Sequence, residues 1–411
     1  MTLSADTLGD QESACENADY EDARTSTMSR MSGPVTILGL DDDVLREIFS
    51  WSTASVDQVW GVGATFENLA FNAILRARHM YLLARICRRF KDIVYGHAAL
   101  WAAIVGVPGD DESLSFVLQK TSQAPLTLVR PFFDAVPDAQ HDFAKHNMHR
   151  FAILRLKQTR DRNWAPVLSG RTLPTLTGLS VITHQDPFYR GPPLVVGQTF
   201  PVKTQPHYED DIPPLYAPNL RFLELQAFYI PFRAPQLQDL QLTSIRGLSP
   251  PALMDALSAL PLLRRLSIVP GRPSMGPQDD LPDEWRWAGS PIVSLPNIEY
   301  VHLEGVESTF VAGLFTSAVI PLSAGISVHI GVLAGMEDMD AIASALRRFI
   351  SYPAYDSVRF QSGVVFDLFT QGADESAPRI SLRMPIMSTA RGYNFFECVA
   401  KVAQHLPRRH V

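Results

Sequence analysis

The stretch that decides the fold at the N-terminal end of this chain is Leu40-Asp41-Asp42-Asp43-Val44-Leu45-Arg46-Glu47-Ile48-Phe49, followed further on by Ile86-Cys87-Arg88-Arg89-Phe90-Lys91-Asp92-Ile93-Val94 and by Leu100-Trp101. Apolar residues in both long runs recur at the spacing of one helix face, and the aspartates suit the positive end of a helix dipole. The pattern predicts helices over 42–51 and 80–95 and a short third helix. It leaves open an extra helix over 66–75. So small a module cannot form a large core, and we expect it to dock on another protein.

Beyond Trp101, phrases of the form Leu-x-x-Leu-x-Leu recur, each ending in the alternation typical of a strand with one buried face. A helix is predicted after Ser249 and another over 338–350, and alternating strands and helices are typical of a leucine-rich repeat. The spacing is uneven, with 17 residues from Leu220 to Leu237 and 26 from Leu237 to Leu263. We therefore predict an α/β chain whose residues 120–411 form an irregular leucine-rich-repeat solenoid, with long loops at 183–216 and 272–294 and a capping helix near 394–406. The phrases are Phe151-Leu154-Leu156, Leu176-Leu179-Val181, Leu220-Leu223-Leu225, Leu237-Leu240-Leu242, Leu263-Leu266-Ile268 and Ile298-Val301-Leu303, with weaker ones at 326–330, 358–360 and 380–382.

The N-terminal module resembles an F-box. The family pattern opens with Leu-Pro-x-Glu and an aliphatic-Leu-x-x-Ile-Phe run, and later has a Val-Cys-basic-x-Trp phrase and a Leu-Trp pair. The matching residues here are Leu40, Val44, Leu45, Ile48 and Phe49, then Cys87, Arg88, Phe90, Leu100 and Trp101. Asp41 replaces the Pro, Asp43 the Glu and Phe90 the Trp, and residues 52–79 lengthen the spacing. Over most of 35–405 the chain resembles the F-box and leucine-rich proteins abundant in mushroom-forming (basidiomycete) fungi.

This resemblance implies a substrate-recruiting subunit of a Skp–cullin–F-box ubiquitin ligase. Residues 36–105 would dock on a Skp-type adaptor, and through it on a cullin, while 120–411 would bind a target protein that the sequence does not identify. The implied adaptor-binding residues are Leu40, Val44, Leu45, Ile48, Phe49, Cys87, Phe90, Leu100 and Trp101. The residues alone leave two alternatives open. These side chains can instead form an ordinary internal core, and Arg88, Arg89 and Lys91 either face an acidic partner or are simply solvated.

Composition excludes several classes of function. The net charge of −7 and the pI near 5.9 argue against a nucleic-acid partner, which needs a clustered basic face. Three widely separated cysteines, Cys15, Cys87 and Cys398, indicate reduced thiols in the cytoplasm or nucleus. Residues 1–33 are acidic and poor in large aliphatic residues, which predicts a disordered tail and no signal peptide. Residues 308–336 carry no charge, but Pro321 and several glycines favour a helix followed by a buried strand over a membrane span.

Catalytic motifs find little support. The chain has no G-x-S-x-G phrase and no Walker loop, and Gly61-Val62-Gly63 lacks the third glycine of a dinucleotide turn. His141, His146 and His149 lie near Asp142, but such loose spacing is typical of a solvated helix rather than a metal site. The acidic runs 209–211 and 279–280 are expected to be solvated. We predict an adaptor that is not an enzyme and needs no cofactor or metal, with two alternatives: a leucine-rich scaffold or recognition protein with a vestigial F-box, or an enzyme built on the histidine cluster.

Overall fold

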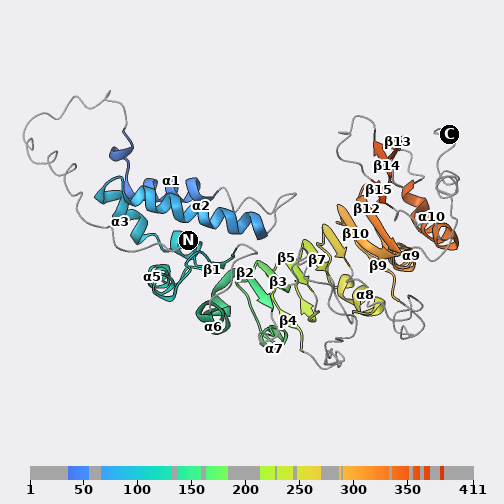
Figure 1. Cartoon of the computed structure of the whole chain (residues 1–411), viewed down its shortest axis with the longest axis horizontal. Coiled ribbons are helices and arrows are strands. Elements are labelled where there is room, and N and C mark those ends of the chain that lie inside the picture. The colour runs from blue at the N-terminus through green and yellow to red at the C-terminus, as the bar shows by residue number, and fades with distance from the viewer. Residues whose placement is uncertain are drawn as a thin grey trace, which may run out of the picture. The chain divides into compact units, whose positions relative to one another are not determined.

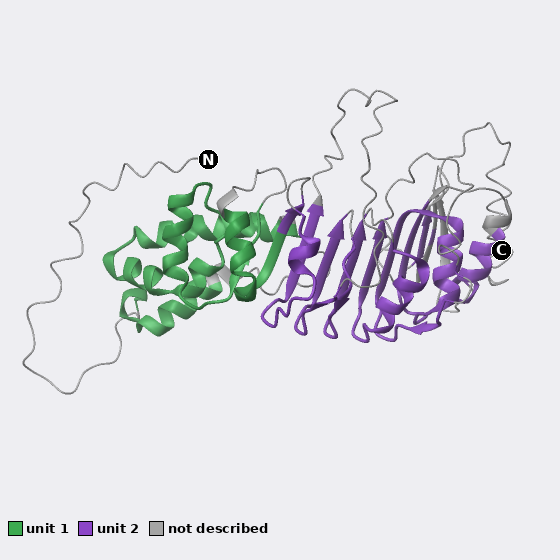
Figure 2. Ribbon diagram, turned by 90° about the horizontal axis from the view of Figure 1, so that it is seen from below, with its two compact units in different colours: residues 1–155 green, residues 156–411 purple. Residues whose placement is uncertain are grey.

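The computed structural model divides into two compact units, Met1–Arg155 and Leu156–Val411 (Figure 2). This boundary lies downstream of 105–120, where the sequence patterns place it. The predicted tail at 1–33 and the predicted capping helix at 394–406 fall outside the residues that the structure describes. Those residues are 36–54, 66–130, 138–158, 163–183, 213–226, 229–243, 248–269, 287, 290–332, 336–350, 355–361, 365–370 and 380–383.

The first unit is mainly helical. The helix predicted at 80–95 is wrong as a single element, because Cys87 is extended (φ −159°, ψ 166°) and separates α2 from α3. The helix left open at 66–75 is real and is the first half of α2. The elements of the first unit are η1 (Ile37–Gly39), α1 (Asp42–Ala54), α2 (Phe66–Ala84), α3 (Arg88–Gly96), α4 (Ala98–Ala102), α5 (Asp111–Thr121), β1 (Leu126–Leu128), α6 (Asp138–His146), η3 (Met148–Arg150) and β2 (Phe151–Gln158). The last residues of β2 belong to the second unit.

An aromatic cluster forms the core of the first unit. Phe49 of α1 packs edge-on against Phe90 of α3, with their ring centroids 5.1 Å apart. Trp101 of α4 is 1% exposed, and its indole Nε1 donates to the carbonyl oxygen of Val94 at 2.9 Å. Tyr95 lies edge-on to the same indole ring at 5.5 Å. Fully burying large apolar side chains of this kind stabilises a fold by roughly 1.5–3 kcal/mol each, so these contacts hold α1, α3 and α4 together.

The second unit is built on a mainly parallel sheet (Figure 1). The strands from β3 to β15 pair in parallel, and the last two, β14 and β13, pair antiparallel. Every strand predicted in this region is confirmed, whereas β14 was not predicted. In spatial order the strands are β3 (Gly178–Thr183), β5 (Phe222–Gln226), β7 (Asp239–Thr243), β8 (Arg265–Val269), β10 (Tyr300–Glu307), β12 (Gly325–Val332), β15 (Ile380–Arg383), β14 (Val365–Thr370) and β13 (Tyr355–Gln361).

The two faces of this sheet differ in character. Leu225, Leu242 and Ile268 align in register on neighbouring strands, and each is buried, as are the residues aligned with them on β10, β12 and β15. The alternate positions, such as Gln241 and Ser267, are only partly buried. Because side chains alternate between the faces of a strand, one face forms the core and the other is polar.

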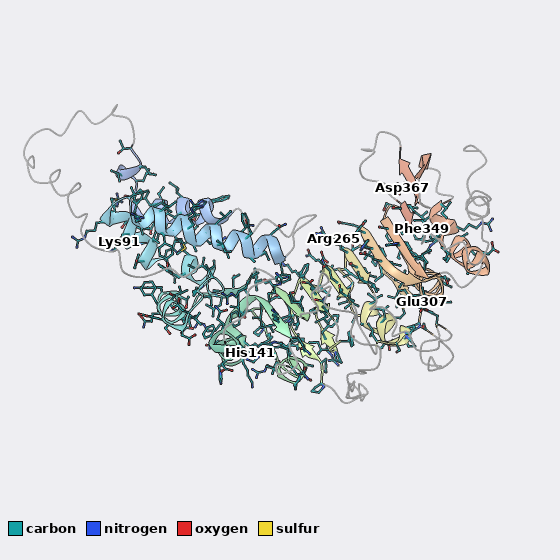
Figure 3. All side chains as sticks on the ribbon, viewed as in Figure 1. Lys91, His141, Arg265, Glu307, Phe349 and Asp367 are labelled. Atoms are coloured by element: carbon teal, nitrogen blue, oxygen red, sulfur yellow. The ribbon has the colours of Figure 1, made fainter. Side chains whose placement is uncertain are left out.

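Short helices and two small sheets complete the second unit. Ser249 caps α8 as predicted, since its side-chain oxygen accepts from the amide of Ala252 at 3.4 Å. Residues 308–332 contain α9 and, after the two-residue β11, the strand β12, so the predicted helix followed by a buried strand is confirmed. Phe315 of α9 meets Phe349 of α10 edge-on at 5.7 Å (Figure 3). These elements are α7 (Ala165–Leu168), α8 (Pro250–Ser258), α9 (Ser308–Ser317) and α10 (Met336–Ile350), and the pairs β4 (Leu215–Tyr216) with β6 (Phe232–Arg233) and β9 (Val293–Ser294) with β11 (Ala318–Val319).

Within the described part of the chain, no helix combines the length and the apolar character that a membrane crossing requires.

Candidate functional site

The residues that match the F-box pattern divide between the interior and the surface of the first unit. Val44 and Ile48 are exposed, at 45% and 37%, while Leu40 and Cys87 are partly buried. Side chains in the interior cannot touch a partner without unfolding, so the internal-core alternative describes that group. The interior residues, all at most 4% exposed, are Leu45, Phe49, Phe90, Leu100 and Trp101.

The exposed residues of α1 form one apolar line, which we call the α1 stripe: Val44, Ile48 and Trp51. Their spacing of four and three residues places them on one side of the helix, and Trp51 is 63% exposed. Together with Asp43 and Glu47 they line a shallow groove. The Trp51 indole Nε1 donates to Glu47 Oε1 at 2.5 Å, which fixes one edge of the ring. The F-box comparison did not point to Trp51, although its place three residues after Ile48 does.

Apolar side chains are also exposed just before α1. Ile37 and Leu38 of η1 are 50% and 53% exposed, and η1 buries none of its residues. Arg89 of α3 reaches this segment: its Nη1 donates to the Leu38 carbonyl at 2.6 Å and its Nη2 to the Leu40 carbonyl at 2.5 Å. Its Nε donates to Asp42 Oδ1 at 2.8 Å. Arg89 therefore turns toward its own chain, unlike either alternative drawn from the sequence. Arg88 is exposed, and so is Lys91 (Figure 3).

The inner side of α1 carries a titratable contact. Ser50 Oγ lies 2.8 Å from His97 Nε2, which ties α1 to the residue between α3 and α4. Burial lowers the pKa of His97, and the nearby charge of Arg46 lowers it further. The neutral imidazole is thus favoured in the folded unit.

The helix α2 exposes a second set of apolar side chains, which we call the α2 stripe: Phe71, Ile74 and Leu82. Phe71 is 60% exposed and Leu82 52% exposed. The opposite side of α2, which includes Phe66, Ala73 and Met80, is buried. Sequence periodicity missed this surface because α2 is apolar on both sides.

In the second unit, the polar face of the sheet gathers hydrogen-bonding side chains. Ser180 Oγ donates to Glu224 Oε2 at 2.6 Å. The rings of Tyr300 and His302 stack nearly parallel with centroids 6.4 Å apart, and Tyr300 is 40% exposed. One residue from each of the seven strands from β3 to β15 in the sheet order forms a continuous column along this face, in register: Ser180, Glu224, Gln241, Ser267, His302, Ser327 and Ser381.

An ion pair lies beside this column. Arg265 Nε of β8 (Figure 3) is 3.5 Å from Asp239 Oδ2 of β7. Burial raises the pKa of the Asp239 carboxyl, and the Arg265 charge and the hydrogen bond from Gln241 only partly oppose that effect. The pair is therefore a costly internal feature of the sheet rather than free charge.

The histidines considered as metal ligands lie on or just after α6. His141 Nδ1 is 3.5 Å from Asp142 Oδ1, while His146 Nδ1 lies 2.7 Å from the Asp142 backbone carbonyl. His149 follows in η3 and is exposed. Within the described ranges, no three side chains of His, Cys, Asp or Glu come together as a metal site would require. The acidic runs 209–211 and 279–280 fall outside these ranges.

Comparison of the chain with protein-family models, with curated proteins and with solved structures finds no match in any of the three. The surfaces described above are therefore the basis for a functional inference. Two are apolar and lie in the first unit, and one is polar and lies in the second.

Proposed function

We propose that this protein is a non-enzymatic adaptor of a Skp–cullin–F-box ubiquitin ligase, working in the cytoplasm or nucleus. Residues 36–105 act as an F-box that docks on a Skp-type adaptor, and through it on a cullin. Residues 120–411 act as an irregular leucine-rich-repeat solenoid that holds a target protein for ubiquitination. The single observation that carries this proposal is the α1 stripe, because it lies on the helix whose sequence resembles the first half of an F-box.

The exposure pattern of α1 supports docking. Its inward residues Leu45 and Phe49 already provide the contacts that α1 needs to fold onto α3. Val44, Ile48 and Trp51 add nothing comparable to that core, yet they keep apolar surface in water. A row of exposed apolar residues that includes a Trp is typical of a helix that buries this face against a partner, since Trp is enriched among interface residues that dominate affinity.

A recurrent backbone contact supports the repeat interpretation. The residue just before each strand donates its amide to the carbonyl of the equivalent residue one strand earlier: Gln238 to Arg221, Arg264 to Gln238 and Glu299 to Arg264, at 2.7–2.8 Å. Side chains repeat a contact as well, because Asn219 and Asn297 donate through Nδ2 to the carbonyls of Pro174 and Pro261. Equivalent contacts at equivalent positions are expected of stacked repeats, despite the uneven spacing.

The polar face of the sheet supports target binding. Its column of Ser, Gln, Glu and His side chains is partly exposed from Glu224 onward, and Tyr300 adds an exposed ring. The side chains on the opposite face are buried in the core. A target is therefore expected to bind on the polar face, where hydrogen bonds confer specificity.

The test measures binding of the full chain to a purified Skp-type adaptor by calorimetry. Replacing Leu45 by Asp would unfold the first unit, so the informative variant is Ile48→Asp with Trp51→Asp. We expect it to abolish binding while circular dichroism shows that the helices of the first unit stay folded. The control is Ile292→Asp, which places one aspartate at a 76% exposed apolar residue of the second unit and should bind like the natural chain.

Two outcomes contradict the proposal. If the double variant binds as well as the natural chain, the α1 stripe is not the docking surface. If the natural chain itself does not bind, the protein is instead a leucine-rich scaffold or recognition protein whose F-box is vestigial, consistent with its Asp41 and Phe90 departures.

A further inference from the structure

We infer that the acidic stretch at residues 6–22 of this chain binds a basic surface on its own first unit. We call that surface the α2–α3 basic row and define it as Arg78, Arg85, Arg88 and Lys91. The contact needs neither the F-box resemblance nor a Skp-type adaptor, so it goes beyond the proposed function and does not depend on it. The observation that carries it is a row of exposed cations close to the point where the acidic end of the chain enters the fold.

The basic row follows from the spacing of residues along α2 and α3. Arg78 and Arg85 are seven residues apart, about two helical turns, which places them on the same side of α2. Arg85 directly follows α2, and its amide still donates to the Leu82 carbonyl at 3.1 Å. Arg88 begins α3 three residues later, and Lys91 lies three residues further along that helix (Figure 3). All four side chains are exposed, so they line one continuous stretch of surface.

These cations have no acidic counterpart in the part of the chain that the structure describes, where none of the four forms an ion pair. Residues 66–96 hold six basic and two acidic residues, a net charge of +4 in a chain whose net charge is −7. Apolar side chains are exposed among the cations, with Tyr81 at 43%, Leu82 at 52% and Ile86 at 60%. The segment that complements such a surface is acidic and carries a few apolar side chains.

The chain contains a segment of this chemistry. Residues 6–22 include no basic residue, and Leu8 and Tyr20 lie among the acidic ones. A block of like charges is often an interaction segment. The acidic residues are Asp6, Asp10, Glu12, Glu16, Asp19, Glu21 and Asp22.

The acidic segment is tethered within reach of the basic row. Arg89, the residue after Arg88, donates from Nη1 to the Leu38 carbonyl at 2.6 Å, so the chain enters the first unit beside α3. Asp22 precedes Thr36 by 14 residues, which span about 45 Å when extended. The 19 residues of α2 are only about 28 Å long. The connection is therefore long enough for residues 6–22 to reach every member of the row.

Tethering makes a set of weak contacts sufficient. A single exposed ion pair contributes little to stability. A segment attached to the same chain, however, has an effective concentration on the order of millimolar at its site, so several such pairs together with apolar contacts can keep it bound. The contact must weaken as salt screens the charges. An acidic partner from outside has to displace the segment before it can occupy the basic row.

The first test is cysteine cross-linking of the full chain. Cys15 lies near the middle of the acidic segment, and Cys87, a free and partly buried thiol, lies between Arg85 and Arg88. We expect a short bismaleimide to join Cys15 to Cys87 within one chain at low salt, identified by mass spectrometry after digestion. High salt should lower the yield by about fivefold or more.

Charge substitutions decide whether the basic row is responsible. Arg85→Glu with Arg88→Glu should lower the cross-linking yield as much as high salt does, and adding Glu12→Lys with Glu16→Lys should restore it. The matched control is Arg171→Glu with Arg221→Glu, the same charge change at two exposed residues of the second unit, which should leave the yield unchanged. Circular dichroism checks that the helices stay folded in each variant.

The second test does not depend on where the two cysteines lie. A carbodiimide joins carboxylates to a lysine ammonium with which they are paired, so it should couple residues 6–22 to Lys91 several-fold more than to Lys145, an exposed lysine on α6. Equal coupling to both lysines, together with no link between Cys15 and Cys87, overturns the contact. A yield that the charge substitutions leave unaltered overturns it as well. Links formed only between two chains assign the surface to a second copy and overturn the contact within one chain.

Discussion

Two adjacent residues on α1 should differ greatly in how much stability is lost when each is shortened to alanine. Leu45 is fully buried, so Leu45→Ala removes apolar carbons from the core and leaves a cavity, which costs about 2–5 kcal/mol. Val44→Ala removes two carbons that are 45% exposed. At roughly 0.8 kcal/mol per buried carbon, the burial loss is about 0.9 kcal/mol, and the better helix propensity of Ala offsets about 0.5 kcal/mol of it. The net cost to stability is then under about 0.5 kcal/mol.

Hydrogen exchange of α3 amides measures both effects on the full chain without treating its two units as one transition. We expect Leu45→Ala to speed exchange roughly 30-fold or more, which corresponds to about 2 kcal/mol, and Val44→Ala to change it by less than about threefold. Adaptor binding should be weakened by Val44→Ala. The reasoning is refuted if Val44→Ala destabilises α3 as much as Leu45→Ala does, or if Leu45→Ala leaves exchange unaltered.

Three further predictions concern other contacts. Trp101→Phe removes the indole donor to the Val94 carbonyl, which keeps the His97 amide as a donor at 3.2 Å, so the loss is that of one hydrogen bond and should destabilise α3 and α4 by about 0.5–1.5 kcal/mol, again seen by hydrogen exchange. Gly313→Ala places a Cβ about 2.2 Å from the Trp287 ring, so that ring must move and become more accessible to acrylamide quenching, whereas Gly96→Ala, with open space around it, should leave quenching unchanged. Because the pKa of His97 is lowered in the folded unit, stability is fully present above the ordinary histidine range and is lost as the pH falls through the lowered pKa; exchange in His97→Gln should lack this acid dependence, and an identical acid dependence there would contradict the assignment.

The strands were predictable because their alternation is strong and repeated. Leu223 and Leu225 each lie two residues apart on one face, and the same pattern returns on β7, β8 and β10. The strand β14 escaped because Asp367 occupies the middle of Val-Phe-Asp-Leu-Phe and breaks the Leu-x-x-Leu-x-Leu phrase. The helix at 80–95 was wrongly joined because apolar periodicity continues through Ile86 and Cys87, although Cys87 is extended.

The proposed docking surface was only partly predictable, because matching residue types does not say which way each side chain faces. Val44 and Leu45 lie about 100° apart around the helix, and only the placement of α3 decides which of them is buried. Ile37 and Leu38, exposed just before α1, lie outside the F-box match, and the Arg89 side chain that contacts the Leu38 carbonyl comes from a residue distant in sequence. A hydrogen bond spanning 51 residues has no local signature.

The in-register column from Ser180 to Ser381 has a consequence for how this protein can diversify. Each of the seven strands from β3 to β15 contributes one side chain to that column, while the neighbours of that residue in sequence are buried in the core. A single substitution in the column therefore changes one side chain of the polar face. The buried residues on either side of it in the strand stay the same. The connections between strands differ in length while the register of the strands is kept, so a change in the length of a connection also leaves the core positions unchanged. Under the proposed function, alternate residues of each strand serve target binding and folding, so the binding residues can change while the core residues stay the same.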